Sequence, residues 1–127
     1  MNASARNVWD RISGSKDEHE LRDFCETFPG TEEAFLAKRR LTEIKKYQDM
    51  VSEYHNCEAS VRETVQREGY KWNEFTIDRV TLNMKVIVAE RFLKENPEHP
   101  EIFAVSEMLE HAKRDVDEFK RRYPNGY

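Results

Sequence analysis

Histidine, cysteine and carboxylate side chains are the residues of this chain that could hold a metal ion or move a proton. The chain has two cysteines and four histidines. His55 and Cys57 are two positions apart, so on one helix their side chains would point about 200° apart and could not share a zinc ion. Di-iron bundles place a glutamate three residues before a histidine, and no histidine of this chain has one. We therefore expect no metal site and no cofactor.

One row of polar residues has the spacing of a proton relay. Glu107, His111 and Asp115 recur every four residues and would share one face of a helix. A row of this kind beside Leu109 and Ala112 is also typical of the solvated flank of a helix. Glycine-rich phosphate loops, Gly-x-Ser-x-Gly motifs and cysteine–histidine pairs with a third member are all missing from the sequence. We expect no catalytic residue, and hence a protein that is not an enzyme.

Two clusters of basic residues are the alternative signal, because they could contact phosphates of a nucleic acid. The first consists of Lys38, Arg39, Arg40, Lys45 and Lys46. The second lies near the C-terminus and consists of Lys113, Arg114, Lys120, Arg121 and Arg122. Acidic residues border both clusters, so a helix surface of mixed charge is the favoured explanation and nucleic-acid contact is the alternative. The aromatic group Tyr70, Trp72 and Phe75 is predicted to cap one end of a helical bundle; stacking on bases is the alternative.

Composition limits the class of protein. The 127 residues fit one domain with a modest core. Charged residues (36%) and hydrophobic residues (38%) are interleaved at helical spacing, which favours a folded helical protein. The net charge of −4 gives no bulk positive field for nucleic acid or anionic lipid. The N-terminus lacks a signal-like apolar run and no segment has the ~20 apolar residues of a membrane span, so we expect a cytoplasmic protein without membrane contact.

Proline and glycine divide the chain into helices. We predict an all-α fold, an antiparallel helical bundle with one long helix (about 31–68), helices at about 74–95 and 100–123, and an N-terminal helical hairpin in residues 1–30. The hairpin is expected to pack on the long helix, and residues 31–123 to form a three-helix bundle. Ser15 and Glu18 have capping-box spacing, and Thr31 and Asn73 are expected N-caps. Cys25 and Cys57 are expected to be small buried hydrophobes.

The long helix carries the main functional prediction. Its apolar residues recur every three or four positions, without a proline or glycine before Gly69: Ala37, Leu41, Ile44, Tyr47, Val51, Tyr54, Cys57, Val61 and Val65. A 38-residue helix would be roughly 57 Å long, more than one neighbour in a domain of this size covers. We therefore expect its N-terminal half to leave an uncovered apolar stripe that binds a protein partner or a second copy. The predicted protein-binding residues are Trp9, Ala37, Leu41, Ile44 and Tyr47.

A weak internal repeat relates the two ends of the chain. Phe24, Pro29, Phe35 and Leu41 recur 68 positions later as Phe92, Pro97, Phe103 and Leu109, and Phe119 with Tyr123-Pro124 begins a third copy. Positions 8–44 resemble the degenerate tetratricopeptide-like helical hairpins of bacterial proteins in the run Trp9-Asp-Arg-Ile12, Leu21-Arg-Asp-Phe24, Phe28-Pro-Gly-Thr31, Ala34, Ala37 and Arg40-Leu41. Such a resemblance implies a protein-binding surface without activity of its own.

Two functions follow as hypotheses. The first is a non-enzymatic helical interaction protein, an adaptor or small subunit of a larger assembly that could also associate with itself. The alternative is a small helical subunit that contacts nucleic acid through the cluster at 38–46. An inhibitor protein from a mobile element would have the same sequence features.

Overall fold

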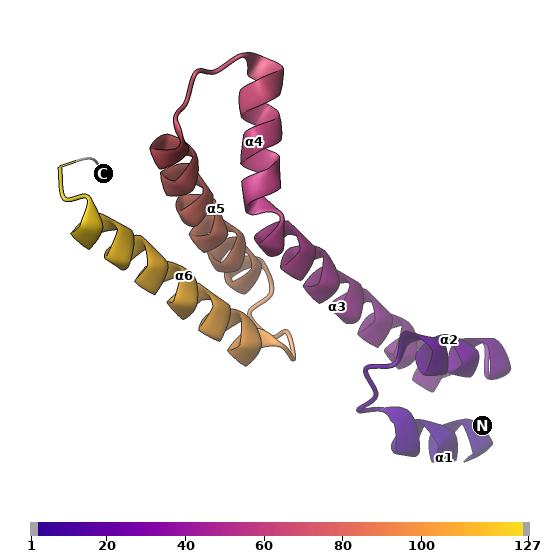
Figure 1. Cartoon of the computed structure of the whole chain (residues 1–127). Helices are drawn as coiled ribbons and strands as arrows, with labels where there is room; N and C mark the ends of the chain where they lie inside the picture. The colour runs from indigo at the N-terminus through magenta and orange to yellow at the C-terminus, as the bar shows by residue number, and fades with distance from the viewer. Residues whose placement is uncertain (1–2, 126–127) are drawn as a thin grey trace. The chain divides into compact units, whose positions relative to one another are not determined.

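The computed structural model describes residues 3–125, which form six α-helices and no strand (Figure 1). The all-α class predicted from the sequence is confirmed. The helices are α1 (Ala3–Ile12), α2 (Glu18–Thr27), α3 (Glu32–His55), α4 (Cys57–Glu68), α5 (Glu74–Glu95) and α6 (Ile102–Arg122). The chain divides into two compact units, an N-terminal unit that ends at Gln48 and a C-terminal unit that begins at Asp49, within α3. The single domain expected from the length stays a prediction.

Short polar side chains begin the helices of the N-terminal unit. The Asp17 carboxylate accepts hydrogen bonds from the backbone N–H groups of His19 and Glu20 at 2.9 and 3.4 Å, so Asp17 is the N-cap of α2. The predicted capping box at Ser15 is therefore wrong by two positions. Thr31 caps α3 as predicted, because its hydroxyl accepts from the N–H of Ala34 at 3.1 Å.

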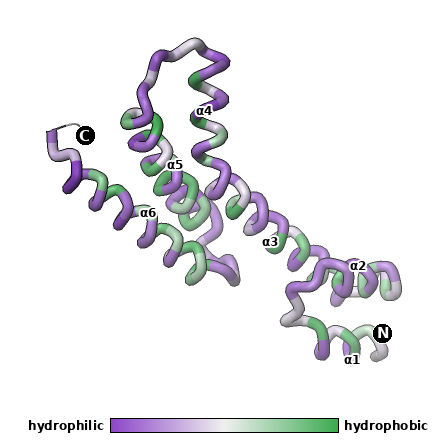
Figure 2. Tube along the Cα trace, viewed as in Figure 1, coloured by the Kyte–Doolittle hydropathy of each residue, from purple (hydrophilic) through white to green (hydrophobic). Residues whose placement is uncertain are grey.

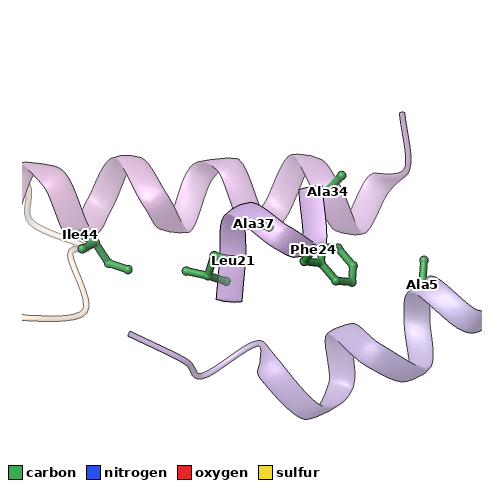
Figure 3. Close-up of a cluster of buried hydrophobic side chains, with 6 residues drawn as sticks. All are labelled: Ala5, Leu21, Phe24, Ala34, Ala37 and Ile44. Carbon is green, nitrogen blue, oxygen red and sulfur yellow. The ribbon is translucent and has the colours of Figure 1, made fainter. Parts of the chain in front are cut away.

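The core of the N-terminal unit joins α1, α2 and the first half of α3. Figure 3 shows its buried side chains, which are Ala5, Leu21, Phe24, Ala34, Ala37 and Ile44. Trp9 packs on this cluster, with its ring 5.6 Å from that of Phe24, and the Phe28 ring lies 5.1 Å from Phe24 on α2. These ring contacts add aromatic packing to the aliphatic core.

The long helix predicted at 31–68 is interrupted at Asn56. This residue has φ −97° and ψ 9°, outside the α-helical range, and the chain bends between α3 and α4 (Figure 1). Backbone hydrogen bonds continue on both sides, from the N–H of Asn56 to Ser52 O and from the N–H of Ser60 to Asn56 O. Asn56 is exposed, and asparagine is a weak helix former, so the bend lies where a break costs little. The prediction of one uninterrupted helix is wrong.

In the C-terminal unit, α5 lies between α4 and α6 and contacts both (Figure 1). Figure 2 shows apolar positions interleaved with polar ones along α6, which buries Val105, Ala112 and Val116. The last turns of α3 join this bundle, because the Tyr54 hydroxyl donates to Met108 O of α6 at 3.2 Å. Burial, with a smaller contribution from the Asp115 carboxylate, raises the pKa of Tyr54.

Three helices end in the same way, with a C-cap residue that directly precedes a proline. The C-cap residues Phe28, Asn96 and Tyr123 have φ of −124°, −131° and −133°, with ψ of 57°, 60° and 63°. Each C-cap N–H bonds to the carbonyl four residues earlier, which belongs to Phe24, Phe92 or Phe119. Proline disfavours the α conformation in the residue before it, so each X-Pro pair stops its helix. The repeated phenylalanine–proline spacing therefore corresponds to a repeated helix ending.

One buried hydroxyl in α5 offers a test of the packing. Thr81 is buried, and its Oγ1 has no hydrogen-bond partner within residues 3–125. Because an unpaired buried hydroxyl keeps its desolvation penalty, Thr81→Val should raise the free energy of unfolding by roughly 1 kcal/mol in urea titrations. Thr64→Val is the matched control, since the Thr64 hydroxyl donates to Ser60 O at 2.9 Å and no gain is expected. A loss of stability in Thr81→Val would contradict an unpaired hydroxyl.

An exposed ion pair links α4 to α5. Arg62 donates to both carboxylate oxygens of Glu74, at 3.0 and 2.7 Å, and to Glu58 at 3.2 Å. The hydrogen bonds from Arg62 lower the pKa of Glu74. The small contribution of the Arg62–Glu74 pair to stability is therefore present above the ordinary pKa of glutamate. It is lost as the pH falls through the lowered pKa of Glu74. In an NMR titration, Arg62→Gln should shift the Glu74 midpoint upward, whereas Glu68→Gln should leave it unchanged; equal midpoints in Arg62→Gln and wild type would contradict the pair.

Candidate interaction surfaces

The predicted protein-binding residues lie mainly in the core of the N-terminal unit. Ala37 and Ile44 are buried, Leu41 and Tyr47 are half-buried, and Trp9 packs against Phe24. The expectation of an uncovered stripe is therefore wrong for Ala37 and Ile44. Leu21 and Phe24 of α2 and Ala5 of α1 share their buried cluster, so the N-terminal hairpin covers the stripe (Figure 3).

Other large apolar side chains face solvent. Phe35 on α3 is 67% exposed and Phe103 on α6 is 83% exposed, with Ile87 on α5 at 58%. Leu36 follows Phe35 and is also exposed. Sequence reasoning missed these residues because it followed the three-four stripe, and Phe35 and Phe103 lie off that stripe. The internal repeat is the sequence feature that indicates these two residues, since it pairs Phe35 with Phe103, and neither belongs to the predicted apolar stripe.

The aromatic residues of the α4–α5 link divide into two groups. Phe75 packs at the end of the bundle, with its ring 5.0 Å from Phe119 and 4.9 Å from Tyr123 of α6. Tyr70 and Trp72 stack on each other at 5.2 Å and are exposed. The predicted capping of the bundle end is thus met by Phe75, whereas Tyr70 and Trp72 form an exposed aromatic pair.

The first basic cluster is mostly solvent-facing. Lys38, Arg39, Lys45 and Lys46 are exposed on α3. Arg40 is half-buried and donates to Glu43 at 3.3 Å, and the Arg39 Nε lies 3.9 Å from the same carboxylate. Glu43 therefore offsets part of the positive charge of this cluster. The residues of the second cluster are exposed on α6, where Arg122 pairs with Glu118 at 3.1 Å.

The residues considered for metal or acid–base chemistry are dispersed. His55 is exposed and contacts the Tyr54 ring, whereas Cys57 is buried and its Sγ lies 3.3 Å from Glu53 O. Glu107, His111 and Asp115 are all exposed along α6. Across residues 3–125, no three histidine, cysteine, aspartate or glutamate side chains gather closely enough to hold a metal ion.

His99 is a structural residue that the sequence analysis did not single out. It is buried, its ring packs edge-on against Phe92 at 4.9 Å, and its Nδ1 accepts a hydrogen bond from the N–H of Glu101 at 3.0 Å. His99 is equivalent to Thr31 in the internal repeat, 68 positions earlier. The Thr31 hydroxyl likewise accepts a hydrogen bond from a backbone N–H at the start of the next helix, that of Ala34. The two hairpins thus order the turn before the second helix with different side chains.

The two hollows of interest are small and of mixed polarity. One, of about 250 Å³, lies in the N-terminal unit between Glu18 and Arg22 of α2 and Leu41, Thr42, Lys45 and Gln48 of α3. The other, of about 180 Å³, lies between α5 and α6 beside Leu82 and Phe119. Both volumes are below the range of roughly 300–1,000 Å³ that is usual for small-molecule sites.

Each unit contains one free thiol, and the two should differ in reactivity. Cys57 is buried, and burial raises the pKa of its thiol, whereas Cys25 is half-buried. Because the thiolate is the reactive form, Cys57 should react with a soluble disulfide reagent at least about tenfold more slowly than Cys25. Single Cys25→Ser and Cys57→Ser variants assign the two rates. Equal rates in the native protein would contradict the burial of Cys57.

Searches against protein families, curated proteins and solved structures find no match to this chain. None of the helices described combines the length and the apolar character that crossing a membrane requires. The functional interpretation therefore depends on the surfaces of the two units.

Proposed function

We propose that this chain is a non-enzymatic helical protein that binds a protein partner, as an adaptor or as a small subunit of a larger assembly. The observation that carries the proposal is the exposure of Phe35 and Phe103, because the cores of both units are closed without their rings. Aromatic side chains are enriched at the centres of protein interfaces. The resemblance of residues 8–44 to tetratricopeptide-like hairpins points in the same direction, and the two free cysteines fit a cytoplasmic location.

Site-specific photo-crosslinking tests this proposal. Benzoylphenylalanine is placed at Phe35 or Phe103, and the full chain is irradiated in the cells that encode it. We expect a discrete crosslinked protein from either position, because the interface is centred there. The same probe at Glu63, an exposed position on α4, is the matched control and should give no such product. Identical patterns from all three positions, or no product from any, would contradict the proposal.

The exposed lysines of α3 support a second function, contact with nucleic acid in a larger complex. Lys38 and Lys45 are seven residues apart, as are Arg39 and Lys46, so the four exposed side chains lie on adjacent rows of one helix face. Phosphate contacts would make the affinity for single- or double-stranded nucleic acid fall steeply as salt is raised from 50 to 200 mM. A Lys38→Gln/Lys45→Gln variant should reduce the slope of that dependence by about 2. Absence of binding at low salt would exclude this function.

A further inference from the structure

The α2–α3 and α5–α6 hairpins are structurally equivalent at a spacing of 68 residues. Phe24 and Phe92 are 3% and 5% exposed, and each lies four residues before a C-cap of the same geometry. Three further pairs are buried in both hairpins, namely Leu21 with Ala89, Ala37 with Val105, and Ile44 with Ala112. Because the inward faces correspond, the outward faces of α3 and α6 correspond too.

The outward face of each helix carries a row that begins with an exposed phenylalanine. The charged residue one turn after it is basic on α3 and acidic on α6. On α3 the row is Phe35, Arg39 and Thr42, and on α6 the equivalent row is Phe103, Glu107 and Glu110. Each row follows i, i+4, i+7 spacing and therefore lies along one helix face. We call these the basic row and the acidic row. Arg39 and Glu107 occupy equivalent positions, each one turn after an exposed phenylalanine.

Charge complementarity identifies an occupant for both rows. A second helix that bears the acidic row and packs parallel to α3 would place Glu107 opposite Arg39 when Phe103 lies beside Phe35, since the spacing is the same on both helices. Arg39 is accessible for this contact, because its side chain is 67% exposed and its ion pair with Glu43 is long, at 3.9 Å. Lys46 and Arg114, the next members of the rows, carry like charges, which confines the contact to the first two turns.

We infer that the partner of this chain is a second copy of itself, in which the basic row of α3 in one copy docks on the acidic row of α6 in the other. The inference rests on the proposed function and specifies its partner. Like other interfaces of two different patches, this one closes into a ring or dimer, or extends into a chain, depending on the rotation between copies. The phenylalanines supply the apolar contact, and the Arg39–Glu107 pair fixes the register.

Charge reversal tests the contact in the purified full chain. Sedimentation equilibrium over a concentration series should give a mass above the 15.2 kDa of one chain. Arg39→Glu and Glu107→Arg should each weaken self-association at least about tenfold, because each places like charges together. The Arg39→Glu/Glu107→Arg double variant should recover most of the affinity. An equimolar mixture of the two single variants should associate more strongly than either variant alone.

Matched reversals elsewhere separate this contact from a general charge effect. Arg121→Glu and Glu63→Arg change the net charge by the same amounts at exposed positions outside the rows, and should leave the mass unchanged. A monomeric wild-type chain at every concentration would overturn the inference, as would single reversals without effect or a double variant without recovery. The proposed function would survive that result if the probes at Phe35 and Phe103 still capture a different protein, and would fail with it if they capture none.

Discussion

Phe24→Ala should unfold the N-terminal unit at room temperature. Phe24 is buried in the core of that unit, and the rings of Trp9 and Phe28 lie 5.6 and 5.1 Å from its own. Truncating a buried phenylalanine costs roughly 3–5 kcal/mol, because transfer energy is lost and a cavity remains. A unit that ends at Gln48 has a total stability on the order of 2–7 kcal/mol at the usual value per residue. The loss is therefore comparable with the whole stability of the unit.

Phe35→Ala is the matched control for Phe24→Ala. The two residues are of the same type in the same unit, but Phe35 is exposed, so the control should change the free energy of unfolding by no more than about 0.5 kcal/mol. The measurement is the reactivity of Cys25, which belongs to the N-terminal unit and should become fully accessible only in Phe24→Ala. If Phe24→Ala keeps the wild-type reactivity, the cluster of Figure 3 does not hold the unit together.

Local signals predict most helix boundaries of this chain, with the start of α2 as an exception, because Asp17 and not Ser15 is its N-cap. The bounds of α5 were predicted correctly because Asn73 supplies a side-chain cap, with its Oδ1 accepting from the N–H of Thr76 at 2.9 Å, and because Asn96 precedes a proline. Thr31 was found for the same reason. These signals depend on residues within one turn of the helix end, so a single sequence contains them in full.

The break at Asn56 could not be predicted from the same signals. Neither proline nor glycine marks it, and the apolar stripe continues across it through Tyr54, Cys57 and Val61, all of which are buried. An asparagine within a helical pattern is compatible with a continuous helix. The bend instead depends on how α3 and α4 pack against the bundle, which is tertiary information.

The expectation of an uncovered stripe is wrong at Ala37 and Ile44 for a related reason. An apolar stripe identifies the buried side of a helix but not what buries it, and here α1 and α2 cover Ala37 and Ile44. The exposed Phe35 and Phe103 are positions of the internal repeat, but periodicity alone assigns them no role. Comparison of the two hairpins separates them from the core, since Phe24 and Phe92 are buried while Phe35 and Phe103 are not.

Phe92→Ala should act on the C-terminal unit as Phe24→Ala acts on the N-terminal unit. Phe92 is buried and packs against His99, which orders the turn before α6, so we expect a loss of roughly 3–5 kcal/mol. The reactivity of Cys57 should rise by two or more orders of magnitude, since about 1.4 kcal/mol of opening free energy corresponds to a factor of ten. Phe103→Ala, the exposed equivalent of Phe35→Ala, should leave it unchanged.

The response of Cys25 in Phe92→Ala decides whether each unit has its own stability. Cys25 and Cys57 lie in different units, so separate cores predict that Cys25 keeps its wild-type rate while Cys57 becomes reactive. Equal acceleration of both thiols would mean that the chain unfolds as one cooperative unit. In that case Phe24→Ala must expose Cys57 as well. The two variants together therefore test, from either unit, whether the core of one can be lost while the other stays folded.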